Sequence, residues 1–347
     1  MRHCLNLKRF LEQHIDEVAL HGLLPALQPN GDGDAVVCRS PFHLFVHAIA
    51  TIFKRRGIVV LCTQANHVQC FLALAARLRG RPLIYDMQDP VPESFVALFA
   101  KQLPRWVASV GHAWLLWSES IICRLAAIIC VVSPGMRQLI LARRDVAEKL
   151  FLFPNLYAGT PAPRTESETP TIVFAGGLQP LFRGIEVQIE ALRLPLAQEF
   201  RLILAGEGER AWVEEYITRS HLSDRVQLLG FLSAADVSRL LAQAHFVVIE
   251  NLAYGLPSKF FEAVAAGVVV ISPRGATDVN AILGDAAIVY DGSAASLASA
   301  LRPAWQNLSL LRERQRSSVE RFLADNRSQL ESLGRRVEMV AQRSTTS

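Results

Sequence analysis

The stretch 251-NLAYGLPSKFFEAVAAGVVVIS-272 contains a turn, a helix and a strand in immediate succession. A Gly-Pro loop comes first, and the small and apolar residues after it favour a helix that begins near Pro257 or Ser258. Gly267 is a typical stop for that helix. Four β-branched residues at 268–271 then predict a buried strand.

A lysine and a glutamate interrupt this otherwise apolar stretch. Lys259 and Glu262 fall in about the first turn of the predicted helix and, being three residues apart, on one face of it. A lysine at the positive end of a helix dipole is unfavourable unless an anion is nearby. A diphosphate would supply that anion, while Glu262 would accept hydrogen bonds from sugar hydroxyls. The alternative is an exposed Lys–Glu pair, worth roughly a few tenths of a kcal/mol.

The alternation of strands and helices extends through most of the chain. From residue 35 onward, short β-branched runs alternate with helical segments, which predicts parallel sheets covered by helices. Pro134 suits the first turn of one helix, and Ser233 with Asp236 forms a predicted helix cap. The predicted strands lie at 35–38, 58–62, 82–85, 127–133, 171–175, 201–205, 226–229, 246–249, 268–271 and 287–290.

Residues 158–170, AGTPAPRTESETP, divide this alternation in two and are expected to form a linker. We therefore predict an N-terminal domain at 1–157, a second doubly wound domain at 171–305 and an amphipathic helical tail at 306–347. Because ligands of open α/β sheets bind at the carboxyl ends of the strands, we expect the active site in a cleft between the domains. The tail is expected to pack on the domains, with a partner-binding helix as the alternative.

The charge of the chain is unevenly distributed. The 347 residues carry a formal net charge of +4, with 17 Lys/Arg against 11 Asp/Glu in residues 1–157 and 19 against 21 in the remainder. This asymmetry indicates an anionic partner for the N-terminal half, such as phospholipid head groups or a phosphate-linked acceptor. Ordinary surface charge is the alternative interpretation. We expect no nucleic acid partner.

All six cysteines lie in the N-terminal half, none in a CxxC pair and several inside apolar runs. This pattern predicts buried thiols of a reducing compartment and not a disulfide or zinc framework. The N-terminus lacks the apolar segment of a signal peptide, so we expect a cytoplasmic protein. Residues 1–34 are predicted to form a helix and a turn, and GDGD at 31–34 is interpreted as a plain turn and not a metal site.

The most apolar region, 106–132, is too often interrupted by polar residues for a membrane span. We predict a buried helix that leads into a core strand. Three tryptophans lie in this region, with Lys101 and Arg105 just before them, and two interpretations remain open for them: shallow docking at a membrane interface, or packing in the core. These tryptophans are Trp106, Trp114 and Trp117.

Two further turns are candidates for phosphate binding. In FAGGLQPLFRGIE, Gly176 and Gly177 let the backbone approach a ligand, and a helix follows from about Gly184 with Arg183 beside it. The turn LAGEGER repeats this arrangement around Glu207. Turns of this kind are common, so neither one identifies a site by itself.

Taken in order, these segments resemble the donor-binding domain of GT-B glycosyltransferases of the family 4 type. The matching segments are FAGGL, FRGIE, LILAGEGE, VQLLGFLS and YGLPSKFFEAVAAGVVVIS, and in the N-terminal half YDMQDPVPES, CVVSPGMRQLI and LFPNLY. The resemblance covers most of residues 58–292. It implies an α/β fold of two Rossmann-like, doubly wound parallel-sheet domains facing a cleft, followed by a helical tail.

The resemblance also implies roles for individual residues. Glu262 matches the glutamate that binds the nucleotide ribose, and Arg183 and Lys259 match positions near the diphosphate. Asp89 and Gln88 stand in the acceptor-side loop, where either one would position the acceptor or the sugar. The remaining predicted donor-binding residues are Gly176, Gly177, Glu207, Gly230, Phe231, Tyr254, Gly255, Leu256, Pro257 and Ser258.

The chain also departs from the family pattern. Tyr254 stands where the first glutamate of Glu-x7-Glu is usual, which removes a carboxylate contact to the donor sugar. Gly177 replaces a common arginine, and Gln88 replaces the histidine of the acceptor-side His-Asp pair. The usual N-terminal strand with its Gly-rich loop is not visible before residue 35.

The resemblance implies a glycosyltransferase that moves a sugar from a nucleotide-diphosphate donor to a hydroxyl acceptor, with retention of configuration and without a metal or other cofactor. We expect a glycan or lipid-linked acceptor, as in surface polysaccharide assembly, and a cytoplasmic protein with a peripheral contact at the inner face of the membrane. The departures favour an alternative, a catalytically degenerate subunit of another transferase. An epimerase or phosphorylase of the same fold is a third interpretation.

Overall fold

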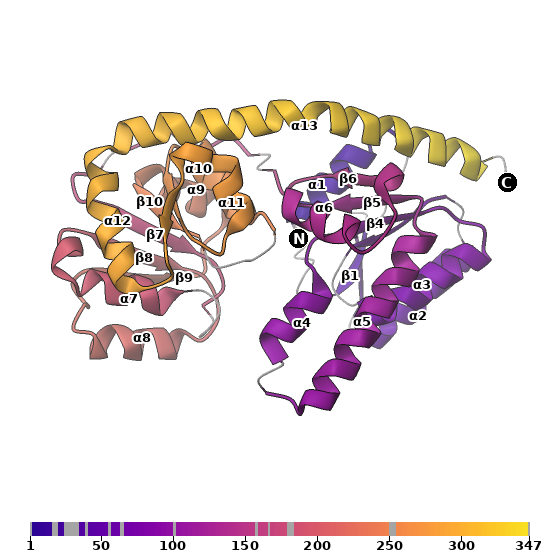
Figure 1. The fold of residues 1–347 in the computed structure, drawn as a ribbon, viewed down its shortest axis with the longest axis horizontal. Helices are drawn as coiled ribbons and strands as arrows, with labels where there is room; N and C mark the ends of the chain where they lie inside the picture. Colours follow the sequence, from indigo (N-terminus) through magenta and orange to yellow (C-terminus); the bar gives the residue numbers. More distant parts are fainter. Residues whose placement is uncertain are drawn as a thin grey trace. The chain divides into compact units, whose positions relative to one another are not determined.

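The computed structural model describes the chain in eleven segments, and two compact α/β units account for them (Figure 1). One unit consists of Met1–Asn155 and Asn326–Ser347, and the other of Leu156–Asp325. The described residues are 2–15, 20–23, 35–38, 41–54, 57–62, 66–99, 102–156, 159–165, 167–178, 184–249 and 255–345. The predicted turn at 31–34 lies outside them.

The N-terminal unit is built on a parallel sheet. Its described strands form a four-stranded sheet in the order β3-β4-β5-β6, with β1 and β2 pairing as a separate parallel ribbon. Strands of this four-stranded sheet that follow one another in sequence therefore lie next to each other. The strands are β1 (Leu20–Leu23), β2 (Ala35–Cys38), β3 (Val59–Cys62), β4 (Leu83–Met87), β5 (Ile128–Val131) and β6 (Leu150–Leu152).

Helices connect these strands and cover the sheet. The predicted cap of α6 is present, because the Ser133 hydroxyl accepts a hydrogen bond from the Met136 amide and Pro134 occupies the first turn. The helices are α1 (Arg2–Leu11), α2 (Pro41–Lys54), α3 (Asn66–Leu78), α4 (Val91–Phe99), α5 (Arg105–Leu125) and α6 (Pro134–Leu141), with a 3-10 turn η1 (Ala147–Lys149). In the described part of the chain, no helix is long and apolar enough to cross a membrane.

The C-terminal unit contains a six-stranded parallel sheet in the order β12-β11-β10-β7-β8-β9. The chain starts at β7, moves outward to β8 and β9, and then returns to the other side of β7 with β10. This reversal is the topological switch point of a doubly wound sheet, where ligands bind at the carboxyl ends of the strands. The strands are β7 (Thr171–Ala175), β8 (Arg201–Ala205), β9 (Val226–Gly230), β10 (Phe246–Val248), β11 (Val269–Pro273) and β12 (Ile288–Tyr290).

Helices cover both faces of this sheet. Ile185, Leu192 and Leu301 belong to the core on one face, and Phe260, Val264 and Val279 to the core on the other. The Ser233 hydroxyl accepts from the Asp236 amide and caps α9, as predicted. The helices are α7 (Ile185–Leu192), α8 (Arg210–Arg219), α9 (Ala234–Gln243), α10 (Ser258–Ala265), α11 (Thr277–Leu283) and α12 (Ala294–Gln306), with 3-10 turns η2 (Pro195–Ala197) and η3 (Gly284–Ala286).

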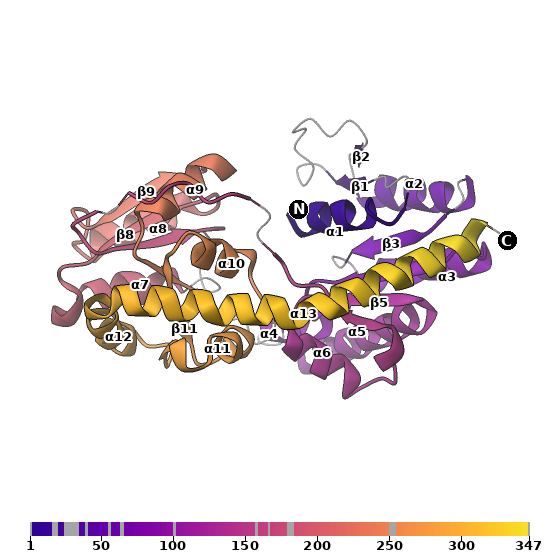
Figure 2. The same cartoon turned by 90° about the horizontal axis from the view of Figure 1, so that it is seen from above.

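The predicted tail forms one long helix, α13 (Leu308–Thr345), which is uninterrupted in Figure 2. Its first part belongs to the C-terminal unit, where the buried Gln315 side chain bonds the backbone of Val270 and Ala286. Its last part belongs to the N-terminal unit, where Val337 packs in one core with Leu7. The tail predicted at 306–347 is thus divided between the two units.

Two of the observed strands, β1 and β6, were not predicted from the sequence. Both are short: β1 lies in the segment 1–34, which was predicted to form a helix and a turn, and β6 ends at the first residue of the segment LFPNLY. The prediction that residues 1–34 form only a helix and a turn is therefore wrong, since β1 lies within them. Among the described cysteines, Cys70, Cys123 and Cys130 are buried as predicted, whereas Cys62 is partly exposed. Burial raises the pKa of Cys123 to about 12, so its thiolate is disfavoured.

Candidate functional site

The turns that follow β7, β8 and β9 are joined by backbone hydrogen bonds. The Gly176 amide donates to the Ala205 carbonyl at 2.8 Å, and the Gly206 amide donates to the Gly230 carbonyl at 2.7 Å. Leu178 donates to the Glu207 carbonyl at 2.7 Å. Glycine turns that were separate in the sequence therefore form one layer at the carboxyl edge of the sheet.

Two glycines in this layer are required by the close approach of the chains. A Cβ on Gly206, whose φ is +153°, would lie 1.6 Å from the Gly176 carbonyl oxygen. A Cβ on Gly208, whose φ is +139°, would lie 2.5 Å from the Leu178 carbonyl oxygen. Both contacts are with backbone atoms that cannot turn away. The predicted turn LAGEGER thus holds the first glycine turn in place.

Lys259 lies against the first of these turns. Its Nζ is 4.8 Å from the centre of the Phe174 ring, and a Cβ added to Gly176 would come within 2.1 Å of that Nζ. The Lys259 ammonium group therefore occupies the space that a side chain at position 176 would fill. Gly177, the next residue, is half-buried. A cation held over glycine backbone at a strand end is suited to a phosphate group.

The N-terminus of α10 lies at the same place as the Lys259 ammonium group. We call Lys259, the glycine turn at Gly176 and the first amides of α10 the donor corner. Pro257 is the N-cap and offers no side-chain hydrogen bond, so the first amides of the helix, including that of Ser258, have no side-chain cap. These amides and the positive end of the dipole are the physical basis for the predicted anion site. Lys259, one position further along, adds a full positive charge at the same end.

The loop before α10 is fixed by a carboxylate that the sequence analysis did not identify. The Gly255 amide donates to Asp278 Oδ2 at 3.0 Å, and Asp278, in the first turn of α11, is only 4% exposed. Gly255 has a φ of +114°, and the neighbouring Leu256 is buried. Asp278 thus holds the loop that leads into the α10 N-terminus, across 23 residues of sequence.

The other described donor candidates lie on α10 and at or just after the carboxyl ends of β8 and β9. Glu262 lies on α10 one turn beyond Lys259 and is 3% exposed. Gly230, with a φ of +77°, ends β9 beside a β-bulge, and Phe231 after it is 60% exposed. Glu207 is exposed. An exposed aromatic ring after a strand end is available for contact with a planar base. Arg183 and Tyr254 lie outside the described residues.

The acceptor-side residues belong to the N-terminal unit. Gln88 and Asp89 follow β4 at its carboxyl end, and Asp89 is exposed. Gln88 Nε2 donates to Asp86 Oδ2 at 2.9 Å, and Asp86 is fully buried. Asp86, which no sequence motif singled out, thus orients the Gln88 amide. Burial and the nearby Asp86 raise the pKa of the Cys130 thiol.

Comparison with known proteins agrees with this geometry. The family model for glycosyl transferases group 1 matches residues 169–307, which include the glycine turns and α10. HepE from Anabaena, solved in complex with UDP-glucose, has a TM-score of 0.63 over 86% of this chain and 85% of its own, at 18% identity. The chain has a GT-B fold, and its residues 169–307 match the glycosyl transferases group 1 model.

Two other comparisons relate to this GT-B chain. Sucrose-phosphate synthase from Thermosynechococcus elongatus has a TM-score of 0.61 at 16% identity, over 87% of this chain and 81% of its own. At such identities, the structures share the fold alone. A human subunit of phosphatidylinositol N-acetylglucosaminyltransferase is 30% identical over 161 residues, or 44% of this chain. The matched stretch spans only 33% of that relative.

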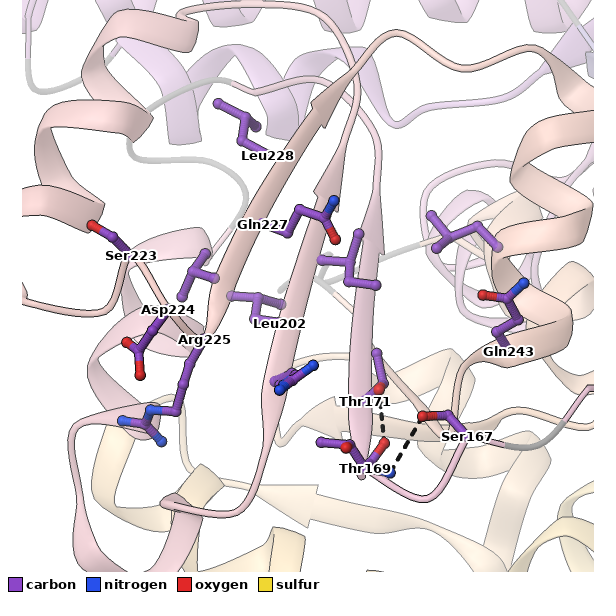
Figure 3. Close-up of a pocket in the computed structure, with 14 residues that line it drawn as sticks. Ser167, Thr169, Thr171, Leu202, Ser223, Asp224, Arg225, Gln227, Leu228 and Gln243 are labelled. Atoms are coloured by element: carbon purple, nitrogen blue, oxygen red, sulfur yellow. Dashed lines mark hydrogen bonds between the residues drawn. The ribbon is translucent and has the colours of Figure 1, made fainter.

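A pocket of about 520 Å³ lies elsewhere in the C-terminal GT-B unit (Figure 3). It involves Thr171, Arg201 and Val226, the first residues of β7, β8 and β9, whereas the glycine turns follow the last residues of these strands. The pocket is therefore separate from the predicted donor residues. Ser167, Thr169, Leu202, Ile203, Ser223, Asp224, Arg225, Gln227, Leu228, Leu240 and Gln243 complete its lining.

Proposed function

We propose that the chain is a glycosyltransferase that moves a sugar from a nucleotide-diphosphate donor to a hydroxyl acceptor. The position of Lys259 over Gly176, beside the N-terminus of α10, is the observation that carries this proposal. The family match over 169–307 supports it. HepE was solved with UDP-glucose, so UDP-sugars are the first donors to test.

The proposed mechanism is largely electrostatic. When the bond between the sugar and the phosphate breaks, negative charge grows on the leaving diphosphate. Lys259, the α10 amides and Arg183 would stabilise that charge, an effect worth several kcal/mol in comparable sites. Glu262 would accept hydrogen bonds from the ribose, and the loop at Phe231 would contact the base.

The acceptor-side chemistry is proposed for the N-terminal unit. Asp89 or Gln88 would position the acceptor hydroxyl or the sugar, with Asp86 fixing the Gln88 amide. Closure of the two domains would exclude water and limit donor hydrolysis. We propose retention of the anomeric configuration and no role for a metal or other cofactor. The anomer of the product, determined by NMR, checks the first point, and activity in the presence of a chelator checks the second.

We further propose that the acceptor is lipid-linked. The basic N-terminal half supports an anionic partner, and the human relative is named for a reaction on phosphatidylinositol. A lipid-linked precursor of a surface polysaccharide or lipopolysaccharide would place the protein in the cytoplasm, with peripheral contact at the inner face of the membrane.

A second candidate function is a non-catalytic subunit of another transferase. Tyr254, Gly177 and Gln88 replace residues that are usual in the family, and the human relative is itself named as one subunit of a transferase. In that case the donor corner would bind a nucleotide without turnover. Co-purification with a second transferase in fixed stoichiometry would favour this alternative.

Turnover by the purified chain tests the proposal. Release of nucleoside diphosphate is measured with a panel of nucleotide sugars, with and without a lipid-linked acceptor. We expect turnover that falls at least about tenfold in Lys259→Gln, because the leaving diphosphate loses a cation. Arg201→Gln is the matched control, since Arg201 is an exposed cation at the first residue of β8. No release with any donor, or equal rates in both variants, would contradict the proposed mechanism.

A further inference from the structure

Helix α5 exposes a row of large apolar side chains. Trp106 is 72% exposed, Val110 64%, Trp114 42% and Trp117 50%. At about 100° per residue these four positions span an arc of about 80° on the helix. The opposite face is buried and includes Leu115. The core-packing interpretation of the tryptophans is therefore wrong for this helix, because the side chains that fill the core are those of its other face.

Helix α3, which packs beside α5, has a second row of the same kind. Phe71 is 48% exposed, Leu74 39% and Leu78 82%, and these positions fall within about 60° of arc. Soluble monomers rarely leave so many large apolar side chains on neighbouring helices in water. The two rows therefore indicate a surface that contacts something other than water. We call these seven side chains of α3 and α5 the apolar rows.

The exposed charged side chains on α2, α3 and α5 are all basic. Residues 35–85 contain no Asp or Glu, and α5 contains a single acid, Glu119, which is 1% exposed and paired with Arg144. The basic residues on α2, α3 and α5 are exposed: Lys54, Arg77, Arg105 and Arg124. Exposed tryptophan flanked by arginine, with no exposed acid on the same helices, matches the interface of an anionic bilayer.

We propose that the apolar rows of α3 and α5 dock the protein on an anionic lipid bilayer. The tryptophan rings and the Phe71 and leucine side chains would enter the head-group region, while Arg77, Arg105 and Arg124 bind lipid phosphates. This proposal rests in part on the proposed function, because a lipid-linked acceptor would be met at that surface. The bilayer is favoured over a second copy of the chain, since like-charged basic surfaces would repel each other in a self-contact.

Vesicle binding tests the docking surface. The purified full chain is sedimented with vesicles of phosphatidylcholine that contain about 30% phosphatidylglycerol. We expect binding that weakens in about 0.5 M NaCl, because salt screens the arginine contacts. The triple variant Trp106→Ala, Trp114→Ala, Trp117→Ala should bind at least about tenfold less. Brominated lipids should quench the tryptophan fluorescence of the wild type and not that of the variant.

A control variant removes three exposed apolar side chains from the C-terminal unit. Leu196, Val289 and Leu310 are 45%, 43% and 50% exposed, and their triple alanine variant should bind vesicles like the wild type. Circular dichroism and thermal melting establish that both variants fold. Donor hydrolysis in the absence of lipid should be unchanged in both, so loss of docking is distinguishable from failure of the proposed function.

Three outcomes would overturn the proposal. One is a wild type that ignores anionic vesicles, and another is a tryptophan variant that binds them as tightly as the wild type. The third is a dimer in sedimentation velocity that the tryptophan substitutions dissolve, which would assign the apolar rows to a second copy of the chain.

Discussion

The two units of this protein differ in how their functional surfaces are made. In the C-terminal unit the candidate donor corner is mostly backbone: glycine turns, helix amides and one lysine. In the N-terminal unit the distinctive surface is made of side chains. Among the described residues, eleven exposed large apolar side chains lie between Val46 and Trp117, against five between Leu196 and Leu310.

This difference matches the kind of ligand proposed for each unit. A diphosphate is small and charged, so fixed amides and a cation at set positions recognise it. A bilayer has no fixed shape, and affinity for it comes from apolar area and charge of the right sign. A change of a single atom in the donor corner should therefore have a large effect on folding or donor binding. Substitutions in the apolar rows should instead weaken membrane binding in proportion to the apolar area removed.

The largest expected effect comes from adding one methyl group to the donor corner. Gly206→Ala would place a Cβ 1.6 Å from the Gly176 carbonyl oxygen at a φ of +153°. We expect a loss of about 3 kcal/mol or more in the free energy of unfolding. Chemical denaturation of the C-terminal unit measures it.

The control for this change is a glycine at which an added Cβ would contact no other atom. Gly292 has a φ of +97° and nothing within 4 Å of an added Cβ. Gly292→Ala should cost only about 1 kcal/mol, the effect of positive φ alone. Equal losses in the two variants would show that the turns after β7 and β8 are not in close contact.

A second prediction concerns the buried face of α5. Burial is the main reason that the pKa of Glu119 rises from 4.5 to about 7, and the neighbouring Arg144 opposes this rise. The folded chain then holds this proton more tightly than the unfolded chain. The resulting stability is present below pH 4.5 and is lost as the pH rises through about 7.

Replacing the Glu119 carboxyl by an amide should remove this pH dependence of the stability. Between pH 4.5 and 7, the stability of the wild type should fall relative to Glu119→Gln by on the order of 2 kcal/mol. Denaturant unfolding at a series of pH values measures the difference. Glu148→Gln, at an exposed acid of the same unit, is the control and should retain the slope of the wild type. A parallel pair of curves for wild type and Glu119→Gln would refute the prediction.

A smaller effect is expected from the carboxylate behind the donor loop. Asp278→Ala removes the acceptor of the Gly255 amide, so the loop before α10 would lose its orientation. We expect the KM for the donor to rise by about tenfold, with a smaller change in kcat. Asp278→Asn keeps an acceptor oxygen and should recover most of the affinity. If Asn behaves like Ala, the hydrogen bond is not what positions the loop.

Much of the fold could be predicted from the sequence because the core strands have strong local signals. The strands at 35–38, 171–175 and 201–205 agree with their predictions at both ends. The missed strands lack such signals: β1 is LHGL and β6 has three residues before a phenylalanine and a proline. They are strands because a neighbouring strand supplies hydrogen bonds, which a local pattern does not show.

The donor corner was predictable to a similar degree. Lys259 and the α10 start follow from the local sequence, whereas Asp278 reaches Gly255 only through the fold. Asp86 likewise could not be identified from the sequence alone. It is buried and Asp89 is exposed, and only the fold shows this difference. Periodicity placed the tryptophans on a helix, but apolar residues occur on both of its faces. Only the packing shows which face is exposed.

Binding of a nucleoside diphosphate tests the central claim most directly. Isothermal titration calorimetry compares UDP and UMP binding to the wild type, Lys259→Gln and Arg201→Gln. We predict that the wild type and Arg201→Gln bind UDP more tightly than UMP, and that Lys259→Gln loses at least about tenfold of its UDP affinity. If UDP and the other nucleoside diphosphates fail to bind, or bind equally with and without Lys259, the corner at Gly176 and α10 is not a diphosphate site.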